Sequence, residues 1–360
     1  MTTPLPLSWY FEPEILEIER RTILASSAEY VACLPAVPEH GSYHTIRHRD
    51  DAEVLVRDRD RVRLLSNVCL HRNLMMHAGR GKANAMICPM HRWSYDLSGA
   101  LLKAPFYPET PCLALPERPL TQWSGILFAG KRDVARDLAG LADRPDLDVS
   151  NYVLADVQEE MQPVNWKVQI ELALENYHAP FTHPGLSRYT SPGTWYDGDG
   201  AYDDDLVSYH EMQPHPEFAS NPGSRAFEEY QRAVLQVNGG KPPQFAALIM
   251  VYYPDIILDW YPSMFVATTC VPLTPELTLS TREMYIDPRA IEIVPNFAEL
   301  AKNAWYEVQR ADDAGHVALH RGRAARYRDD RHARVGHEVY HAMEDCVVVF
   351  HRLLMRTAHA

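Results

Sequence analysis

The sequence predicts an α+β fold in which a small β domain near the N-terminus is followed by a larger domain of strands and helices. Between residues 30 and 130, short strand-like runs alternate with Pro and Gly. Beyond Pro145, longer helical and strand-like stretches take over. The chain has 360 residues, of which 46% are hydrophobic, so it is long enough for two domains with full cores.

The expected elements follow one another along the chain. Apolar residues at helical spacing predict a helix over residues 13–25, and a second helical stretch is expected over 166–178. The Gly-, Asp- and Pro-rich passage 192–222 is expected to be irregular. Strands are expected over 245–286, and helices return after Glu292.

Charge and cysteine usage exclude several classes of protein. The net charge of −13 argues against a nucleic-acid partner, because binding phosphates needs a basic stripe. Residues 1–10 carry no basic region followed by an apolar run, and nowhere do about eighteen apolar residues follow one another. We therefore expect a soluble, cytoplasmic protein with no membrane segment. The six cysteines are scattered along the chain, which argues against a disulfide framework.

Two short segments each offer one thiol and one imidazole. Cys69 and His71 form the first pair and Cys88 and His91 the second, with sixteen residues between the pairs. In a Rieske [2Fe–2S] cluster two cysteines hold one iron and two histidines hold the other, so each segment would supply one ligand to each iron. A structural zinc site is the alternative, but zinc fingers usually place both cysteines on one element and both histidines on another. The alternating pattern therefore favours a Rieske centre.

The residues around these pairs are typical of two hairpin tips. Apolar runs over 62–68 and 85–87 precede the two segments. The polar run 93–95 could donate hydrogen bonds towards the cluster and so tune its potential. Basic residues are in local excess here, which indicates either a solvated face or a surface that steers an acidic electron donor. They are Arg63, Arg72, Arg80, Lys82 and Arg92.

A second group of possible ligands consists of Glu175, His178 and His183. On a helix, positions 175 and 178 share a face while 183 would point elsewhere, so the chain must turn at Pro180 and Pro184. Two histidines brought together in this way, joined by a carboxylate from a distant segment, would form the facial triad of non-haem Fe(II) oxygenases. Spacing alone also allows these histidines to be surface or satisfied core residues.

From Leu5 to its last helix, the chain resembles the catalytic α-subunits of Rieske non-haem iron oxygenases, the ring-hydroxylating oxygenase family. The resemblance is carried by residues 67–72 and 88–95, by 165–167 with positions 171, 175, 178 and 183, and by 308–322. Residues 343–351 are similar to the end of the branch that includes choline and carnitine monooxygenases. Departures from the usual family residues occur at Met90, Arg92, Leu172, Glu175 and Ala311.

The resemblance implies roles for particular residues. Cys69, His71, Cys88 and His91 would bind the [2Fe–2S] cluster. His178, His183 and Asp312 would bind a mononuclear Fe(II), with Asp313 as the alternative carboxylate. Glu175 would connect His91 of one subunit to His178 of the next, within a homotrimer or a multiple of three.

The resemblance also implies the domain organisation. The Rieske domain, which is similar to a β-sandwich, would occupy 31–140. A helix-grip-like catalytic domain, with a central antiparallel sheet flanked by helices, would occupy 141–360, and the helical segment 1–30 would pack against it.

The implied activity is that of an oxygenase component that uses O2 to hydroxylate a small organic substrate. Electrons would come from NAD(P)H through a separate flavin/iron–sulfur reductase or a ferredoxin, because this chain carries no Gly-rich dinucleotide fingerprint. The alternatives are an arene cis-dihydroxylating dioxygenase and a Rieske electron-transfer protein without oxygenase activity. The second group of possible ligands, in the part of the chain that follows the cluster segments, argues against a protein that only transfers electrons.

Two substrate classes are consistent with the residues of the second domain. An aromatic cage would bind a quaternary ammonium or an N-methylated amine through cation–π attraction, with burial of these rings in the core as the alternative. Candidates for that cage are Trp195, Tyr196, Tyr202, Tyr252, Tyr253, Trp260 and Tyr261. An aromatic carboxylate would instead need a basic group such as Arg188, Arg225 or Arg282.

Overall fold

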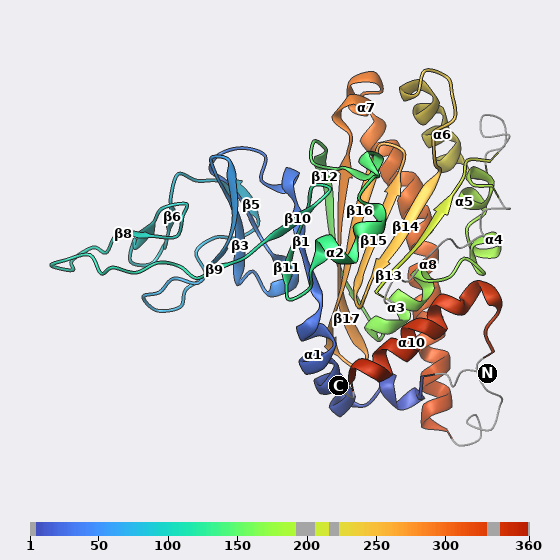
Figure 1. Cartoon of the computed structure of the whole chain (residues 1–360), viewed down its shortest axis with the longest axis horizontal. Coiled ribbons are helices and arrows are strands. Elements are labelled where there is room, and N and C mark those ends of the chain that lie inside the picture. The colour runs from blue at the N-terminus through green and yellow to red at the C-terminus, as the bar shows by residue number, and fades with distance from the viewer. Residues whose placement is uncertain (1–4, 192–205, 216–222, 330–338, 359–360) are drawn as a thin grey trace. The chain divides into compact units, whose positions relative to one another are not determined.

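The computed structural model describes residues 5–191, 206–215, 223–329 and 339–358 (Figure 1). It consists of two compact units. The larger unit comprises Met1–Ala28, Gly130–Gly140 and Leu154–Ala360, and the smaller unit comprises Glu29–Ala129 and Leu141–Val153.

The smaller unit is built from three sheets of short strands. The first has the order β1 (Ala28–Cys33), β11 (Ile126–Gly130), β10 (Thr121–Trp123). The second has the order β5 (Arg80–Lys82), β2 (Ser42–Thr45), β3 (Glu53–Asp58), β4 (Arg61–Ser66), β9 (Glu117–Arg118). The third has the order β6 (Met86–Ile87), β7 (Ser94–Tyr95), β8 (Leu101–Lys103). Alternate residues of β3 point inward, so that Val54 and Val56 join Cys69 and Cys88 in one buried cluster.

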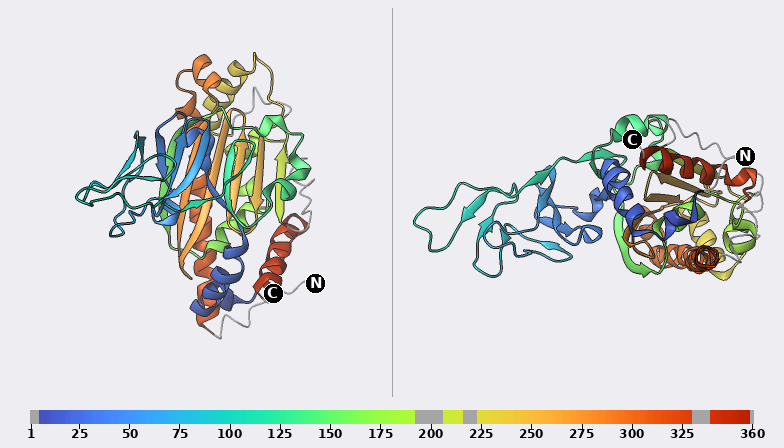
Figure 2. Two further views of the ribbon diagram at one scale, coloured as in Figure 1. Left: turned by 60° about the vertical axis from the view of Figure 1, so that its left-hand side comes forward. Right: turned by 90° about the horizontal axis from the view of Figure 1, so that it is seen from below.

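The larger unit is organised around a six-stranded sheet. Its order is β12 (Val153–Gln162), β17 (Leu277–Ile286), β16 (Met264–Thr274), β15 (Ile256–Tyr261), β14 (Ala247–Tyr252), β13 (Val207–Met212). Neighbouring strands from β13 to β17 pair antiparallel. Figure 2 shows this sheet from two further directions, and its right-hand view looks along the longest helix.

Helices accompany this sheet. The α-helices are α1 (Pro13–Thr22), α2 (Val134–Asp137), α3 (Trp166–Ala173), α4 (Ala179–Thr182), α5 (Pro184–Tyr189), α6 (Arg225–Val237), α7 (Pro288–Ile293), α8 (Phe297–Arg328) and α10 (Asp345–Ala358). Short 3-10 turns occur at Leu7–Tyr10, Leu24–Ser26, Leu34–Ala36, Arg47–Arg49, Ala139–Leu141, Pro145–Leu147 and Ala342–Glu344. α3 contacts β14, β15, β16 and α8. The predicted α+β class, with a small β-rich domain and an antiparallel sheet flanked by helices, is confirmed.

Two expectations for individual elements were wrong. The predicted helix over 166–178 ends at Ala173, because the chain turns before Glu175. The passage 192–222 was expected to be irregular, yet Val207–Met212 forms β13 at the sheet edge. This segment buries alternate side chains against β14, a signal that the flanking Asp- and Pro-rich residues obscured.

Buried charged side chains connect α3 to the rest of the larger unit. Lys167 Nζ lies 2.6 Å from Glu19 Oε1 of α1, and both side chains are fully buried. Glu171 accepts hydrogen bonds from Arg323 of α8 and from His351 of α10. Burial by itself would raise the pKa of Glu171, but Arg323 and His351 lower it to about 2. Because loss of one partner would leave a buried charge unpaired, this network fixes the position of α3.

No helix among the described residues is both long enough and apolar enough to cross a membrane. The longest, α8, carries charged residues along its length.

Candidate metal centres

The two Cys–His segments of the smaller unit adopt the same kind of turn. The Cys69 N–H donates to the Leu74 carbonyl (2.9 Å), and the Asn73 N–H donates back to the Cys69 carbonyl (2.9 Å). Around Cys88, the same two bonds run from the Cys88 N–H to Trp93 (2.8 Å) and from Arg92 to Cys88 (3.0 Å). The fourth residue after each cysteine has a positive φ, 60° at Asn73 and 61° at Arg92, as the closing of such a turn requires.

These turns place the four predicted ligands together. The cysteines are buried, at 1% and 2% exposure, whereas His91 is exposed and His71 is half-buried. The ring centroids of His71 and His91 lie 4.6 Å apart. Thiols on the inner side and imidazoles on the outer side are the donor set that a Rieske cluster needs. The site therefore fits a [2Fe–2S] group.

Neighbouring aromatic residues support this site. The Tyr95 hydroxyl lies 3.5 Å from Cys69 Sγ and accepts the Leu70 N–H at 3.1 Å. The Trp93 ring stacks on the His71 ring at a centroid distance of 5.0 Å and an angle of 13°. Burial, followed by the hydrogen bond to Cys69, raises the pKa of Tyr95, so its hydroxyl keeps its proton and can donate to sulfur.

Among the five basic residues near the cluster segments, two are neutralised. Arg63 pairs with Glu117 at 2.9 Å, and Lys82 pairs with Glu39 at 2.9 Å. Arg72 and Arg92, which lie within the two turns, are exposed.

In the larger unit, His178 and His183 lie on either side of a single helical turn. α4 begins directly after His178 and ends directly before His183, where α5 starts at Pro184. Both short helices carry proline in their first turn, where its fixed φ suits a helix start and its missing N–H costs nothing. The turn therefore brings the two imidazoles to one place.

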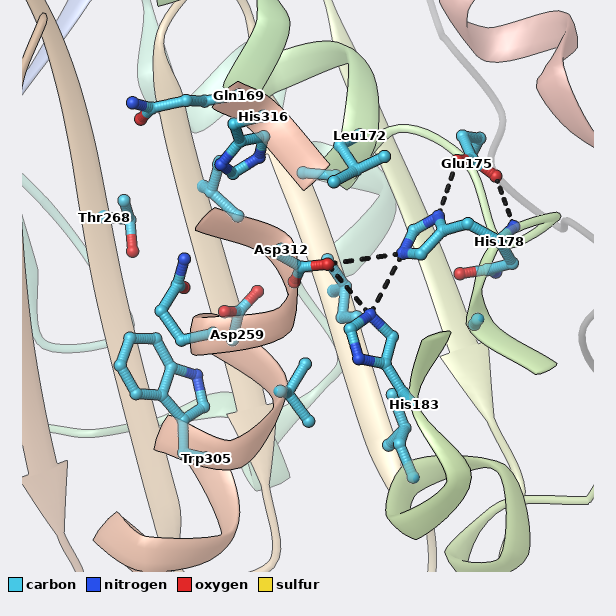
Figure 3. Close-up of a pocket in the computed structure, with 18 of the residues that line it drawn as sticks. Gln169, Leu172, Glu175, His178, His183, Asp259, Thr268, Trp305, Asp312 and His316 are labelled. Carbon is cyan, nitrogen blue, oxygen red and sulfur yellow. Dashed lines mark hydrogen bonds and ion pairs between the residues drawn. The ribbon is translucent and has the colours of Figure 1, made fainter. Parts of the chain in front are cut away.

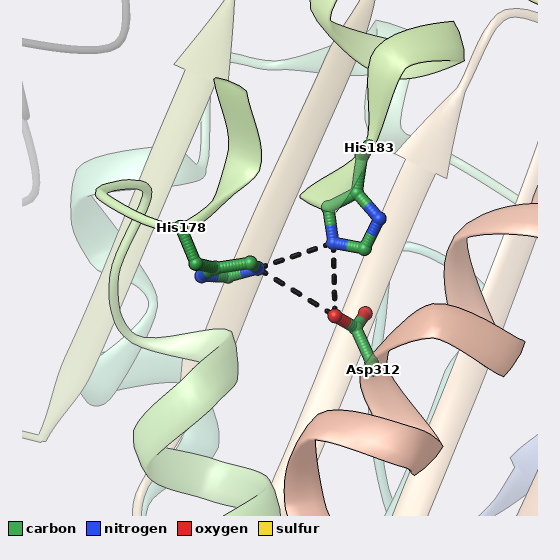
Figure 4. Close-up of side chains that lie close together, drawn as sticks. All are labelled: His178, His183 and Asp312. Carbon is green, nitrogen blue, oxygen red and sulfur yellow. Dashed lines mark hydrogen bonds and ion pairs between the residues drawn. The ribbon is translucent and has the colours of Figure 1, made fainter. Parts of the chain in front are cut away.

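Asp312, midway along α8, completes the group (Figure 4). The Nε2 atoms of His178 and His183 lie 3.1 Å apart. Asp312 Oδ1 lies 2.9 Å from His183 Nε2 and 3.5 Å from His178 Nε2. Atoms that bind one metal ion at about 2.1 Å and at right angles lie about 3.0 Å from one another. The triangle therefore fits one ion bound on a single face, with its other positions left open.

Glu175 contacts His178 at Nδ1, the ring nitrogen that does not face His183 and Asp312 (Figure 3). Its Oε1 lies 2.5 Å from His178 Nδ1, and its Oε2 accepts the backbone N–H of His178 at 3.1 Å. Burial would lower the pKa of His178, but hydrogen bonds to Asp312 and Glu175 raise it to about 9. Burial would raise the pKa of Asp312, but the two histidines hold it well below its usual value. The carboxylates of Glu175 and Asp312 therefore favour a positive charge between the two imidazoles, and a bound metal ion would supply that charge.

The alternative carboxylate, Asp313, points away from the two histidines. Its Oδ1 accepts hydrogen bonds from Arg282 (2.7 Å) and Gln309 (3.0 Å). Arg282 also pairs with Glu160 at 3.0 Å, so its charge is already balanced. The structure thus brings Asp312, and not Asp313, beside His178 and His183.

The triad lies in the wall of a pocket between the sheet, α3 and α8. Apolar residues of the wall include Leu172, Ile249 and Ile257. Its remaining polar and aromatic residues include Gln169, Asp259, Tyr261, Thr268, Trp305, Gln309 and His316. Asp259, Trp305 and Thr268 lie on one side of Asp312 in Figure 3, and the two histidines lie on the other.

Most of the predicted substrate-binding residues lie elsewhere. Tyr252, Tyr253 and Trp260 are buried and are absent from the described pocket wall, whereas Tyr261 is part of it. Trp195, Tyr196 and Tyr202 lie outside the described residues. Of the three candidate arginines, Arg282 reaches the wall but is paired, Arg225 is exposed and pairs with Glu229, and Arg188 is not among the described lining residues.

Sequence reasoning missed Asp259 and Trp305. One signal was available, since Asp259 interrupts the apolar run Ile256–Tyr261, and a charged residue within a buried strand needs a reason. Burial raises the pKa of Asp259 to about 7, with the hydrogen bond from the Trp305 indole opposing the shift.

Comparison with known proteins agrees with this arrangement. Residues 28–114 match the Rieske [2Fe-2S] domain, and residues 147–359 match the ring hydroxylating alpha subunit (catalytic domain). The chain is 37% identical over 325 residues to a putrescine 2-hydroxylase of Ralstonia nicotianae, covering 90% of this chain and 87% of that protein. It is 34% identical over 339 residues to a putrescine 2-hydroxylase of Bordetella bronchiseptica, covering 90% and 77%.

A solved structure of a quaternary ammonium Rieske monooxygenase has the same fold. It aligns with a TM-score of 0.75 and 19% identity over 98% of this chain and 95% of the other. Fold and matched domains together define an oxidoreductase with a Rieske [2Fe–2S] cluster and a mononuclear iron as its cofactors. The chain belongs to the Rieske oxygenases of the ring-hydroxylating α-subunit family.

Proposed function

We propose that this chain is the oxygenase component that hydroxylates a C–H bond of a small aliphatic amine. His178, His183 and Asp312 would hold the mononuclear iron, and Cys69, Cys88, His71 and His91 would hold the cluster. When bound, the iron supplies the site at which O2 is reduced and the substrate is oxidised. The observation that carries the proposal is the triangle of ligand atoms in the pocket wall.

An amine is favoured over an aromatic carboxylate by the charges of the pocket. Arg282 is balanced by Asp313 and Glu160, so the wall offers no free cation among its described residues. The relatives that match most of the chain are named for hydroxylation of putrescine, which is a diamine. Pocket and relatives therefore favour a cationic substrate.

Electrons would reach the pocket from NAD(P)H through a separate reductase or ferredoxin. Arg72 and Arg92 are exposed within the two cluster turns and would attract an acidic donor. In a homotrimer, His91 of one subunit would hydrogen-bond Glu175 of the next. Both Glu175 oxygens contact His178, Oε1 at the ring and Oε2 at the backbone N–H, but each carboxylate oxygen can accept a second hydrogen bond, so a second imidazole can also donate to it.

The two compact units would have different roles. The smaller unit would carry the cluster, and the larger unit would carry the iron and the substrate pocket. The N-terminal helix α1 packs with α10 in the larger unit, which supports its assignment to the catalytic domain.

The test begins with anaerobically purified protein. We expect about three irons and two sulfides per chain and the visible spectrum of a Rieske cluster. With a reductase, NADH and 18O2, we expect one labelled oxygen in the product from 1,4-diaminobutane and none in products from benzoate. About two irons per chain would leave an electron carrier only, and colourless, zinc-containing protein would overturn the proposal.

A further inference from the structure

Asp259 occupies an unusual position on the floor of the pocket. It lies on β15, where Ile257, Asp259 and Tyr261 alternate onto the face that lines the pocket. Its partners across the sheet are Ile249 of β14 and Val266 of β16, both apolar. A carboxylate between such neighbours is costly unless a partner compensates its charge.

The other carboxylates of the pocket already have such partners. Glu175 faces His178, and Asp312 faces His178 and His183. Asp259 Oδ1 is out of contact with solvent and has no hydrogen-bond partner among the described residues. Asp312 Oδ1 is buried in the same way but lies 2.9 Å from His183 Nε2, whereas no histidine, lysine or arginine among the described residues pairs with Asp259.

The groups around Asp259 suit a small cation. The indole N–H of Trp305 lies beside the carboxylate, and the Tyr261 ring belongs to the same wall. Thr268 and Gln309 add uncharged oxygen atoms that can accept hydrogen bonds. Arg282, the arginine of the described lining, is paired with Asp313 and Glu160, and among the described residues no ion pair joins it to Asp259.

We propose that Asp259 is the substrate-binding residue that pairs with the ammonium group of a primary amine. This inference rests on the proposed oxygenase function and names the substrate class of that same pocket. A primary ammonium carries three N–H donors, which an unpaired carboxylate oxygen and neighbouring neutral oxygens can accept. A quaternary ammonium carries no N–H donor and is bound by cages of several aromatic rings. The described wall supplies two large aromatic rings, Tyr261 and Trp305, and not such a cage.

Pairing at Asp259 would also position the substrate. Asp259 and the triad line the same pocket from different elements: Asp259 lies on β15, the two histidines flank α4, and Asp312 lies on α8. An ammonium fixed at Asp259 would leave its carbon chain to extend along Ile257 and Leu172 towards the histidines. The distance between the charge and the oxidised carbon would then be set by the pocket.

The experiment measures binding to iron-loaded, reduced holoenzyme under anaerobic conditions by calorimetry. The probes are 1,4-diaminobutane, its neutral analogue 1,4-butanediol and its bis-trimethylammonium analogue. We expect the wild type to bind the diamine at least about 30-fold more tightly than either analogue. Asp259→Asn, which keeps the shape but removes the charge, should weaken diamine binding by about 30-fold and leave diol binding unchanged. Asp259→Glu should restore part of the loss.

Asp156→Asn is the matched control, because it makes the same chemical change outside the pocket wall. Asp156 accepts a hydrogen bond from the Tyr306 hydroxyl at 2.6 Å. The Asp156→Asn variant should keep the wild-type affinity for the diamine to within about twofold.

Equal affinities of the wild type for diamine and diol would overturn the inference without any variant, and so would full diamine affinity in Asp259→Asn. An enzyme that hydroxylates only neutral or quaternary compounds would refute the role of Asp259 and leave its oxygenase function standing. Absence of the mononuclear iron would instead refute the proposed function.

Discussion

The two candidate metal centres differ in how far apart in sequence their ligands lie. The four cluster residues fall between positions 69 and 91, within two turns that share one hydrogen-bond pattern. The three residues of the triad span positions 178 to 312 and meet because α8 packs against α3 and α5. A site made of local turns can be recognised in a sequence, whereas a site assembled by packing depends on the whole fold.

The two centres also differ in their surroundings. Cys69 and Cys88 lie among apolar residues of the smaller unit, and a tyrosine hydroxyl stands beside one sulfur. The triad lies among carboxylates, with Glu175 behind His178 and Asp259 across the pocket. A cluster that stores an electron needs its potential tuned, while an open iron site needs ligands held in place and a wall that selects the substrate.

The largest effect is expected from removing a triad histidine, which should abolish one centre and leave the other intact. In His178→Ala we expect the iron content to fall by about one per chain, while sulfide content and the Rieske spectrum stay unchanged. Hydroxylation should fall by at least about 1000-fold, because the catalytic iron is lost. Iron analysis with visible and EPR spectra checks this, and Cys88→Ser is the reciprocal control that should lose colour. Loss of colour in His178→Ala would show that the centres are not independent.

Changing Glu175 should affect the connection between the centres more than the centres themselves. Glu175→Gln keeps the size of the side chain but removes its charge, so both metal contents should be preserved. Turnover should fall by about 100-fold, since the partner that orients His178 is altered. Stopped-flow oxidation of the reduced cluster measures the step directly, and Glu175→Asp should recover part of the rate. Normal reoxidation in Glu175→Gln would remove the bridging role.

The buried network of the larger unit should make its stability depend on pH. Because the pKa of Glu171 is lowered from 4.5 to about 2, its contribution is fully present above pH 4.5 and is lost as the pH falls towards 2. The shift corresponds to about 3 kcal/mol in the free energy of unfolding. Denaturant unfolding of the apoprotein between pH 6 and pH 2 measures this loss. Glu171→Gln should be less stable at pH 6 and should show a shallower pH dependence, and an unchanged slope would contradict the assignment.

The smallest expected effect concerns the tyrosine beside the cluster. Tyr95→Phe removes the hydroxyl that lies 3.5 Å from Cys69 Sγ, and such a hydrogen bond stabilises the more negative, reduced cluster. A contribution of about 1 kcal/mol corresponds to a potential lower by about 40 mV for a one-electron couple. A redox titration followed by EPR measures the shift, and Ser94→Ala is the control, because Ser94 donates to the Arg92 carbonyl. A higher potential in Tyr95→Phe would reverse the proposed direction.

The sequence by itself determined the α+β class and predicted the cluster motif, and it offered the pair His178 and His183 as one possible ligand group. These features are local: Cys69 to His71 and Cys88 to His91 are short turns, and the strand and helix periods repeat within each element. The resemblance to the family added Asp312, with Asp313 left as an alternative, because spacing cannot say which of two adjacent carboxylates faces inward.

Only the tertiary structure decided which side chains meet. It placed Asp312 beside the histidines and paired Asp313 with Arg282, and it ended α3 at Ala173 where helical spacing predicted a longer helix. It also separated Tyr261, which lines the pocket, from aromatic neighbours that belong to the core. Asp259 acquires its significance in the same way, because burial and the absence of a partner among the described residues depend on strands and helices distant in sequence.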